Sequence, residues 1–209
     1  MKVKAKFIKK FHLALSLSLA CLGTTAATNT VFAQSNETSF YSTRSHLPKL
    51  KFDLEFADNQ RLTEKDLKGK VVLVYFGYTY CPDVCPTTMA ELALMKSMLN
   101  EQQQEQVQVV MISVDPHRDT PERLEQYLDA FGAGALGLTG TEREIADIAK
   151  RYRVAYQIEK PKNPNNPELY DVMHAEGIYV FDQSGRASFL ASNSHDIESM
   201  RDRVLELLN

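Results

Sequence analysis

The feature that most constrains this chain is a pair of cysteines between an apolar run and a helical pattern. Residues 71–76, VVLVYF, are continuously apolar, which is typical of a strand buried on both faces of a sheet. Cys81 and Cys85 follow in the segment 77–86, GYTYCPDVCP, where the strand gives way to a helix. A helix N-terminus offers unpaired N–H groups and a partial positive charge, and both favour thiolate over thiol. We therefore expect this loop to be the active centre, with the cysteines as its redox-active pair.

Pro86 limits where the helix can begin, because proline has no N–H to donate to the carbonyl of Pro82. We expect the helix to begin at Pro86 and residues 81–85 to form a loop in which the two sulfurs converge. Converged sulfurs close a disulfide when oxidised, and when reduced they offer two thiolates to a soft metal ion. A bridge across only three intervening residues stabilises a fold little, so we expect the pair to serve chemistry rather than stability.

Beyond this loop, apolar runs and helical patterns alternate along the chain. Strands are expected over residues 51–56, 71–76, 107–114, 154–159, 177–181 and 187–191. Helices are expected from residue 86 to about residue 99 and over residues 121–131, 141–152 and 197–208, with one helical turn over 63–67. This order predicts an α/β layered fold. The cysteine pair after the first buried strand narrows it to a thioredoxin-like fold: a central mixed sheet flanked by helices, with an added N-terminal strand and a C-terminal hairpin.

Two polar segments lie between these elements. Residues 160–168, rich in proline and asparagine, are expected to form a loop at the tip of a hairpin. Residues 115–121, DPHRDTP, follow the second buried strand, with Thr120 as the expected N-cap and Pro121 as the first helical residue. This second segment either only caps the helix or also shapes a docking loop.

The first 33 residues differ from the rest in composition. They carry five lysines and no acidic residue, with an apolar run over residues 11–22 and small residues up to Ala33. This order is typical of a secretory signal peptide cleaved after Ala33, which would place the mature protein in the periplasm. Two alternatives stay open: an uncleaved membrane anchor, and a lipid anchor on Cys21.

The remaining chain has the length and charge of a single soluble domain. Residues 34–49 are polar and aperiodic and are expected to be a flexible linker, which leaves residues 50–209 as the folded domain, expected to be a monomer. Without the five lysines of the leader, 19 basic residues stand against 27 acidic ones, a net charge of −8. Such an acidic domain argues against nucleic acid as a partner.

Two thiolates alone make an incomplete metal site, so a third ligand is sought among the histidines. His174 precedes the strand expected over residues 177–181, and in a thioredoxin-like sheet the segment that enters this strand passes beside the cysteine loop. His117, in the loop after the second buried strand, is a second candidate. His46 in the linker and His195 at the last helix are expected to be surface residues. Thiolate with imidazole suits copper or zinc rather than calcium or magnesium.

Several motifs together resemble those of the Sco (SenC) family, and the resemblance extends from about Phe52 to the C-terminus. They are residues 77–86 (GYTYCPDVCP), 113–121 (SVDPHRDTP) and 138–141 (LTGT), and His174 before residues 177–182. The resemblance implies a thioredoxin-like fold that binds one copper ion through Cys81, Cys85 and His174. Family members often have Asp before this histidine and Ser after it, whereas here the neighbours are Met173 and Ala175.

The resemblance also implies a function. Members of the Sco family help to deliver copper to the dinuclear copper (CuA) site of cytochrome c oxidase subunit II, or to reduce the cysteines of that site. Some bacterial members resemble periplasmic thiol–disulfide or redox-defence proteins. The implied cargo is thus a copper ion, Cu(I) or Cu(II), and the implied partner is subunit II or another periplasmic copper or thiol protein.

Three other functions stay open. A thiol oxidoreductase of the thioredoxin type has two residues between its cysteines and a proline before the facing strand; here three residues intervene, and Met173-His174-Ala175 stands in place of the proline. A thiol peroxidase is suggested by Thr79, two residues before Cys81, although it would need neither the second cysteine nor His174. The simplest alternative is a binding module with an inert disulfide.

Overall fold

The computed structural model of the protein describes residues 38–44, 46–57 and 60–209. The expected signal peptide at residues 1–33, including Cys21, and linker residues 34–37 lie outside the described residues, so the interpretations of that segment stay predictions. Within the described part, no helix is both long enough and apolar enough to cross a bilayer.

The core of the fold is a six-stranded mixed sheet. In spatial order its strands are β1 (Phe40–Ser42), β10 (Ala187–Ala191), β9 (Ile178–Phe181), β4 (Val71–Gly77), β5 (Val107–Ser113) and β6 (Leu136–Leu138). Strands β4, β5 and β6 are parallel to one another. Strand β9 pairs antiparallel with β4, and β10 pairs antiparallel with β9 to form the expected C-terminal hairpin.

Strands β4 and β5 are central because they can be buried on both faces. Every residue of both strands is buried, as their continuous apolar runs predict. Their register runs from Val71 opposite Val107 to Gly77 opposite Ser113. The loops that follow the two strands therefore leave the sheet at the same edge.

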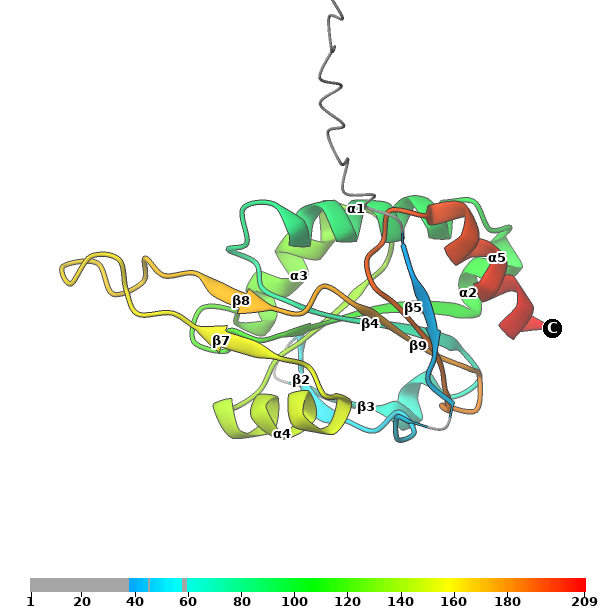
Figure 1. Cartoon of the computed structure of the whole chain (residues 1–209), viewed down its shortest axis with the longest axis horizontal. Helices are drawn as coiled ribbons and strands as arrows, with labels where there is room; N and C mark the ends of the chain where they lie inside the picture. The colour runs from blue at the N-terminus through cyan, green and yellow to red at the C-terminus, as the bar shows by residue number, and fades with distance from the viewer. Residues whose placement is uncertain (1–37, 45, 58–59) are drawn as a thin grey trace, which may run out of the picture. The chain divides into compact units, whose positions relative to one another are not determined.

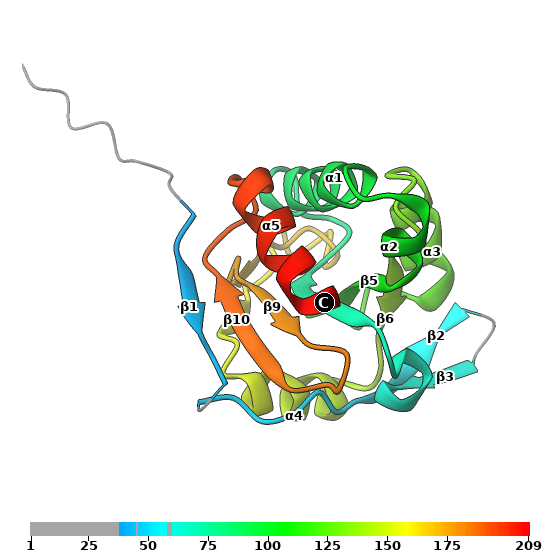
Figure 2. The ribbon, with the colours of Figure 1, turned by 90° about the vertical axis from the view of Figure 1, so that its right-hand side faces the viewer.

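Helices cover both faces of this sheet. Their bounds are α1 (Val84–Ser97), α2 (Glu101–Glu105), α3 (Pro121–Asp129), α4 (Glu142–Tyr152) and α5 (Ile197–Leu208). Helices α1, α3 and α5 lie on one face and α4 lies on the opposite face, as Figures 1 and 2 show. The buried side chains of α1 include Met89, Leu92 and Met95, which confirms the expected apolar stripe. The expected central mixed sheet flanked by helices is thus confirmed.

Two small antiparallel sheets complete the fold. The expected N-terminal strand is β2 (Asp53–Phe56), which pairs with β3 (Gln60–Thr63) and precedes the short 3-10 helix η2 (Glu64–Leu67). Strand β7 (Tyr156–Ile158) pairs with β8 (Val172–His174), and the proline-rich loop between them forms the hairpin tip that the sequence predicts. This hairpin extends from one end of the domain in Figure 1.

Helix α1 begins earlier than expected. Its first residue is Val84 and not Pro86, so Cys85 lies within the first helical turn rather than in the preceding loop. Pro86 is tolerated there because the first N–H groups of a helix have no intrahelical acceptor, so the missing N–H costs nothing.

The expected linker also differs from the structure in one place. Residues 40–42 form β1 and pair with β10, with Phe40 opposite Ala191 and Ser42 opposite Phe189. The flexible-linker prediction is therefore wrong for these residues. A strand of three residues is too short to show a hydrophobic period, which is why the sequence pattern does not indicate it.

Candidate metal centre

Three side chains with soft ligand atoms converge at the end of β4. Cys81 lies in the loop after β4, Cys85 in the first turn of α1, and His174 at the end of β8. Their two sulfurs and one imidazole nitrogen all lie within 4.8 Å of one another, and Cys85 Sγ is 3.3 Å from His174 Nε2. Neither cysteine is in a disulfide, and both are buried, with exposed fractions of 9% for Cys81 and 0% for Cys85. The residues expected as metal ligands are thus brought together.

The sheet explains why a histidine so far along the chain reaches the cysteines. Strand β8 ends at His174, and β9 begins four residues later beside the end of β4, where Ile178 pairs with Tyr75. The segment that enters β9 therefore has to pass the cysteine loop.

The imidazole of His174 is held in an orientation that suits a metal ligand. Its Nδ1 lies 3.1 Å from the carbonyl oxygen of Ala175, which can only accept, so Nδ1 donates to it and Nε2 faces the sulfurs. The rings of Tyr75 and Tyr78 pack edge-on against it, at centroid distances of 5.9 Å and 5.6 Å. A backbone carbonyl thus orients the ring, although Met173 and Ala175 stand where members of the Sco family often have Asp and Ser.

The two cysteines differ in protonation. A hydrogen bond from the Cys85 thiol, helped by one from His174 and by backbone N–H groups, outweighs burial and lowers the pKa of Cys81 from 9.0 to about 3. One of these groups is the backbone N–H of Cys85, whose nitrogen lies 3.4 Å from Cys81 Sγ. The sulfur therefore accepts a hydrogen bond at the N-terminus of the helix, as a capping side chain does. The same hydrogen bond to Cys81, together with burial, raises the pKa of Cys85. The reduced site therefore holds one thiolate and one thiol.

This asymmetry predicts how alkylation of the reduced, metal-free protein depends on pH. Because Cys81 stays a thiolate, its rate with iodoacetamide should be nearly constant from about pH 8 to about pH 5, whereas an ordinary thiol slows about tenfold per pH unit. The rate is measured by mass spectrometry of the Cys81 peptide. A tenfold fall per pH unit at Cys81 would contradict the assignment.

Gly77 allows the close contact between β4 and the helix that carries Cys85. A Cβ atom added at Gly77 would lie 2.9 Å from Cys85 Sγ and 2.7 Å from the ring of Tyr75. Only a residue without a side chain lets the buried sulfur pack this tightly against the end of the strand.

Comparison with known proteins provides evidence that is independent of this geometry. Residues 42–209 match the model of the SCO1/SenC family. The chain belongs to the SCO1/SenC family. It is 33% identical over 155 residues to the mitochondrial protein SCO2 of Saccharomyces cerevisiae, an alignment that covers 74% of this chain and 51% of the yeast protein. The chain spans about half the length of this and several other curated relatives that it matches.

Solved structures of SCO1/SenC proteins share the fold. ScoI of Bradyrhizobium japonicum with copper bound superposes with a TM-score of 0.68 at 34% identity, covering 77% of this chain and 99% of that one. The apo Sco1 protein of Thermus thermophilus gives a TM-score of 0.70 at 34% identity, covering 83% and 99%. These neighbours have the thioredoxin-like fold, which confirms the fold that the sequence predicts.

The other histidines that the structure describes lie outside this centre of the SCO1/SenC domain. His117, the second candidate ligand, is exposed and contacts Glu142, with 3.2 Å between Nε2 and Oε1. His46 is exposed, and His195 contacts Glu91 with its Nδ1 at 3.1 Å. Among the described residues, the group that could hold a metal comprises Cys81, Cys85 and His174.

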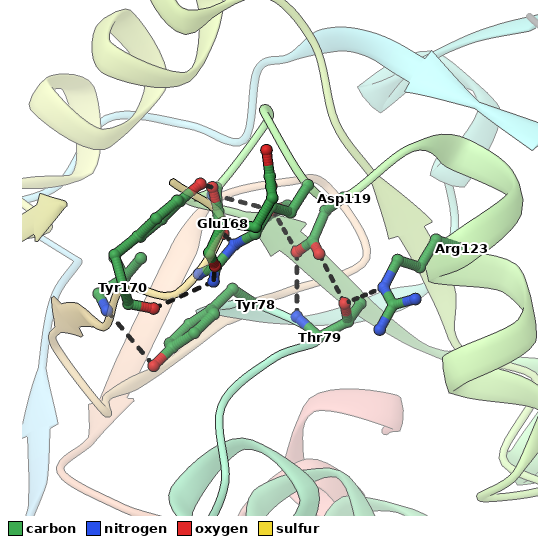
Figure 3. A network of polar contacts seen from close by, with 10 residues as sticks. Tyr78, Thr79, Asp119, Arg123, Glu168 and Tyr170 are labelled. Atoms are coloured by element: carbon green, nitrogen blue, oxygen red, sulfur yellow. Dashed lines mark hydrogen bonds and ion pairs between the residues drawn. The ribbon is translucent and has the colours of Figure 1, made fainter. Parts of the chain in front are cut away.

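A buried polar network beside the centre, shown in Figure 3, was not predicted from the sequence. The carboxylate of Asp119 accepts hydrogen bonds from the backbone N–H of Thr79 at 3.0 Å and from its hydroxyl at 2.6 Å. The hydroxyl of Ser113 donates to the same carboxylate at 2.7 Å. The sequence signal for this network is a run of charged residues directly after a buried parallel strand, at residues 115–119.

The hydroxyl of Thr79 makes its hydrogen bonds within this network. Its hydroxyl donates to Asp119 and accepts a hydrogen bond from Arg123 Nε at 2.8 Å. The arrangement gives Thr79 a structural explanation, so its position before Cys81 offers little support for a peroxidase.

Proposed function

We propose that this SCO1/SenC domain binds one copper ion through Cys81, Cys85 and His174 and takes part in assembling the CuA site of cytochrome c oxidase. The observation that carries this proposal is the convergence of two sulfurs and one imidazole nitrogen of His174 within 4.8 Å. Two thiolates with one imidazole suit copper, whereas magnesium and calcium prefer oxygen ligands. Burial of the cysteines favours a poorly hydrated ion bound by protein atoms alone.

The protonation of the site determines what binding requires. Cys81 is already a thiolate, so this ligand needs no chemical change. Cys85 is a thiol with a raised pKa and has to lose its proton when the metal binds. Copper binding should therefore release about one proton per ion near neutral pH.

Reduction of a partner's disulfide is a second function, and the unequal cysteines favour it. Cys81 is the more exposed of the two and the one that is a thiolate, so it is suited to attack a disulfide sulfur and form a mixed disulfide. Cys85 would then attack Cys81, which releases the reduced partner and leaves the Cys81–Cys85 disulfide. The disulfide form has no thiolate to offer, so copper binding and disulfide formation exclude each other.

The partner and the compartment follow from the same proposal. A copper acceptor with cysteine or histidine ligands, such as cytochrome c oxidase subunit II, is the expected partner of a monomeric domain. The leader at residues 1–33 supports export to the periplasm, where such sites are assembled.

A Cu(I) titration tests the proposed function. The reduced protein should bind a single Cu(I) ion in competition with a chromogenic chelator, and the same protein oxidised to the Cys81–Cys85 disulfide should bind none tightly. Absence of Cu(I) binding by the reduced protein would refute copper delivery. If that protein nevertheless reduces a small disulfide, the reductase function would be primary.

A further inference from the structure

We propose that Arg118 is a positioning residue of the metal centre: its buried guanidinium fixes the β7–β8 hairpin, and with it His174, beside the cysteine loop. The centre is assembled from two separate parts of the chain. Cys81 and Cys85 belong to the loop and helix that follow β4, whereas His174 belongs to a two-stranded sheet that forms no ladder with the central sheet. Besides the short connection from β8 to β9, contacts of the hairpin have to set the distance between these parts.

Arg118 makes this contact on the hairpin side. Its Nη1 donates to the carbonyl oxygens of Glu168 at 2.9 Å and Tyr170 at 3.0 Å, both in the segment that leads into β8 and His174. Its guanidinium also stacks on the ring of Tyr170, 3.6 Å from the centroid. Two hydrogen bonds and one stacked ring thus tie the hairpin to a residue of the β5–α3 loop.

The same guanidinium contacts the cysteine side. It lies 4.6 Å from the ring centroid of Tyr80 and 5.8 Å from that of Tyr78. These two tyrosines directly follow and precede Thr79 in the sequence. Tyr80 directly precedes Cys81, and Tyr78 packs against the imidazole of His174. Cation–π contacts of this kind strengthen when the cation is removed from water.

Arg118 is itself held rigidly. Its Nε donates to Asp115 at 2.5 Å, and the two side chains are 3% and 0% exposed. The hydroxyl of Tyr170 donates to the other carboxylate oxygen of Asp115 at 2.7 Å. The neighbouring Asp119 binds Thr79 of the cysteine loop, as Figure 3 shows. The β5–α3 loop therefore holds both halves of the metal centre at once.

This inference rests on the proposed copper function, and the experiment separates the two. Arg118→Lys keeps a positive charge beside Asp115 but loses the planar fork that reaches two carbonyls and stacks on tyrosine. Because such supporting residues typically contribute 10–100-fold to metal affinity, we expect the Cu(I) affinity of this variant to fall by roughly tenfold or more. The Cu(II) charge-transfer band and electron paramagnetic resonance spectrum should also change, because His174 is displaced.

Two tyrosine variants provide a matched comparison of copper binding that can still be made if Arg118→Lys fails to fold. Tyr170→Phe removes the hydroxyl bound to Asp115, and Tyr152→Phe removes a buried hydroxyl that accepts from the Lys51 N–H at 2.7 Å, on the α4 side of the domain. We expect Tyr170→Phe to change copper affinity and spectra in the same direction as Arg118→Lys, and Tyr152→Phe to retain both.

Hydrogen exchange in the copper-free protein supplies a readout that does not depend on metal. Amides of residues 156–174 should exchange faster in Arg118→Lys and Tyr170→Phe than in the parent. The inference would be overturned if Arg118→Lys and Tyr170→Phe kept the copper affinity, spectra and amide exchange of the parent. An equal loss of copper affinity in Tyr152→Phe would also overturn it. If the parent binds no copper, the proposed function fails, and exchange alone decides whether Arg118 holds the hairpin.

Discussion

Replacing His174 with alanine is expected to lower Cu(I) affinity several hundredfold while the protein stays folded. Four-ligand sites of thiolate and imidazole bind zinc with about 10–16 kcal/mol, so one ligand contributes roughly 3–4 kcal/mol, which corresponds to roughly several hundredfold in affinity. The imidazole is only partly buried and lies on a hairpin outside the central sheet, so its removal should leave the core intact. Competition with a chromogenic chelator measures the affinity, and circular dichroism checks the fold.

His117→Ala is the matched control for this prediction. His117 is also a histidine near the carboxyl ends of the parallel strands, but its side chain is 54% exposed and contacts Glu142 rather than a sulfur. Its replacement should leave Cu(I) affinity unchanged. Equal losses in the two variants, or parent-like binding by His174→Ala, would remove His174 from the ligand set.

Replacing Asp115 with alanine is expected to destabilise the copper-free domain by about 3–5 kcal/mol, because it leaves a buried guanidinium without its counter-ion. Arg118 is 3% exposed at the side chain and cannot turn to water without breaking its contacts with the hairpin. Tyr170 would also lose its hydrogen-bond acceptor. The free energy of unfolding is measured by urea denaturation of the reduced protein.

Asp53→Ala is the comparison for this second prediction. Asp53 also pairs with an arginine, Arg61, at 2.7 Å, but the two side chains are 65% and 41% exposed. An exposed ion pair of this kind contributes about 1 kcal/mol or less. If Asp115→Ala costs no more than Asp53→Ala, the Asp115–Arg118 pair does not support the fold in the way that its burial indicates.

The convergence of Cys81, Cys85 and His174 could be predicted because it depends on features that a sequence displays. The continuous apolar runs of β4 and β5 mark buried parallel strands, and the cysteine segment follows the first of them. The strand entered after His174 then has to pass that segment. The family motifs supplied the remaining step, the assignment of the histidine.

Other features depend on tertiary contacts that have no local pattern. Strands β1 and β8 are three residues long, too short to show a period, and each is defined by its partner strand. Helix α1 begins before Pro86 because this proline lies in the first turn, where a missing N–H costs no hydrogen bond. The role of Arg118 depends on backbone carbonyls 50 and 52 residues away, which no spacing rule reveals.

The separate β7–β8 hairpin bears on the order in which a bound ion would change ligands. The sulfurs stand on the loop and helix that continue the central sheet, whereas the imidazole stands on a two-stranded sheet without a ladder to it. We expect an incoming ligand to replace the imidazole first, while both sulfurs still hold the ion. Copper would then pass from one protein to the other through shared coordination, and the free ion would not enter the surrounding solvent.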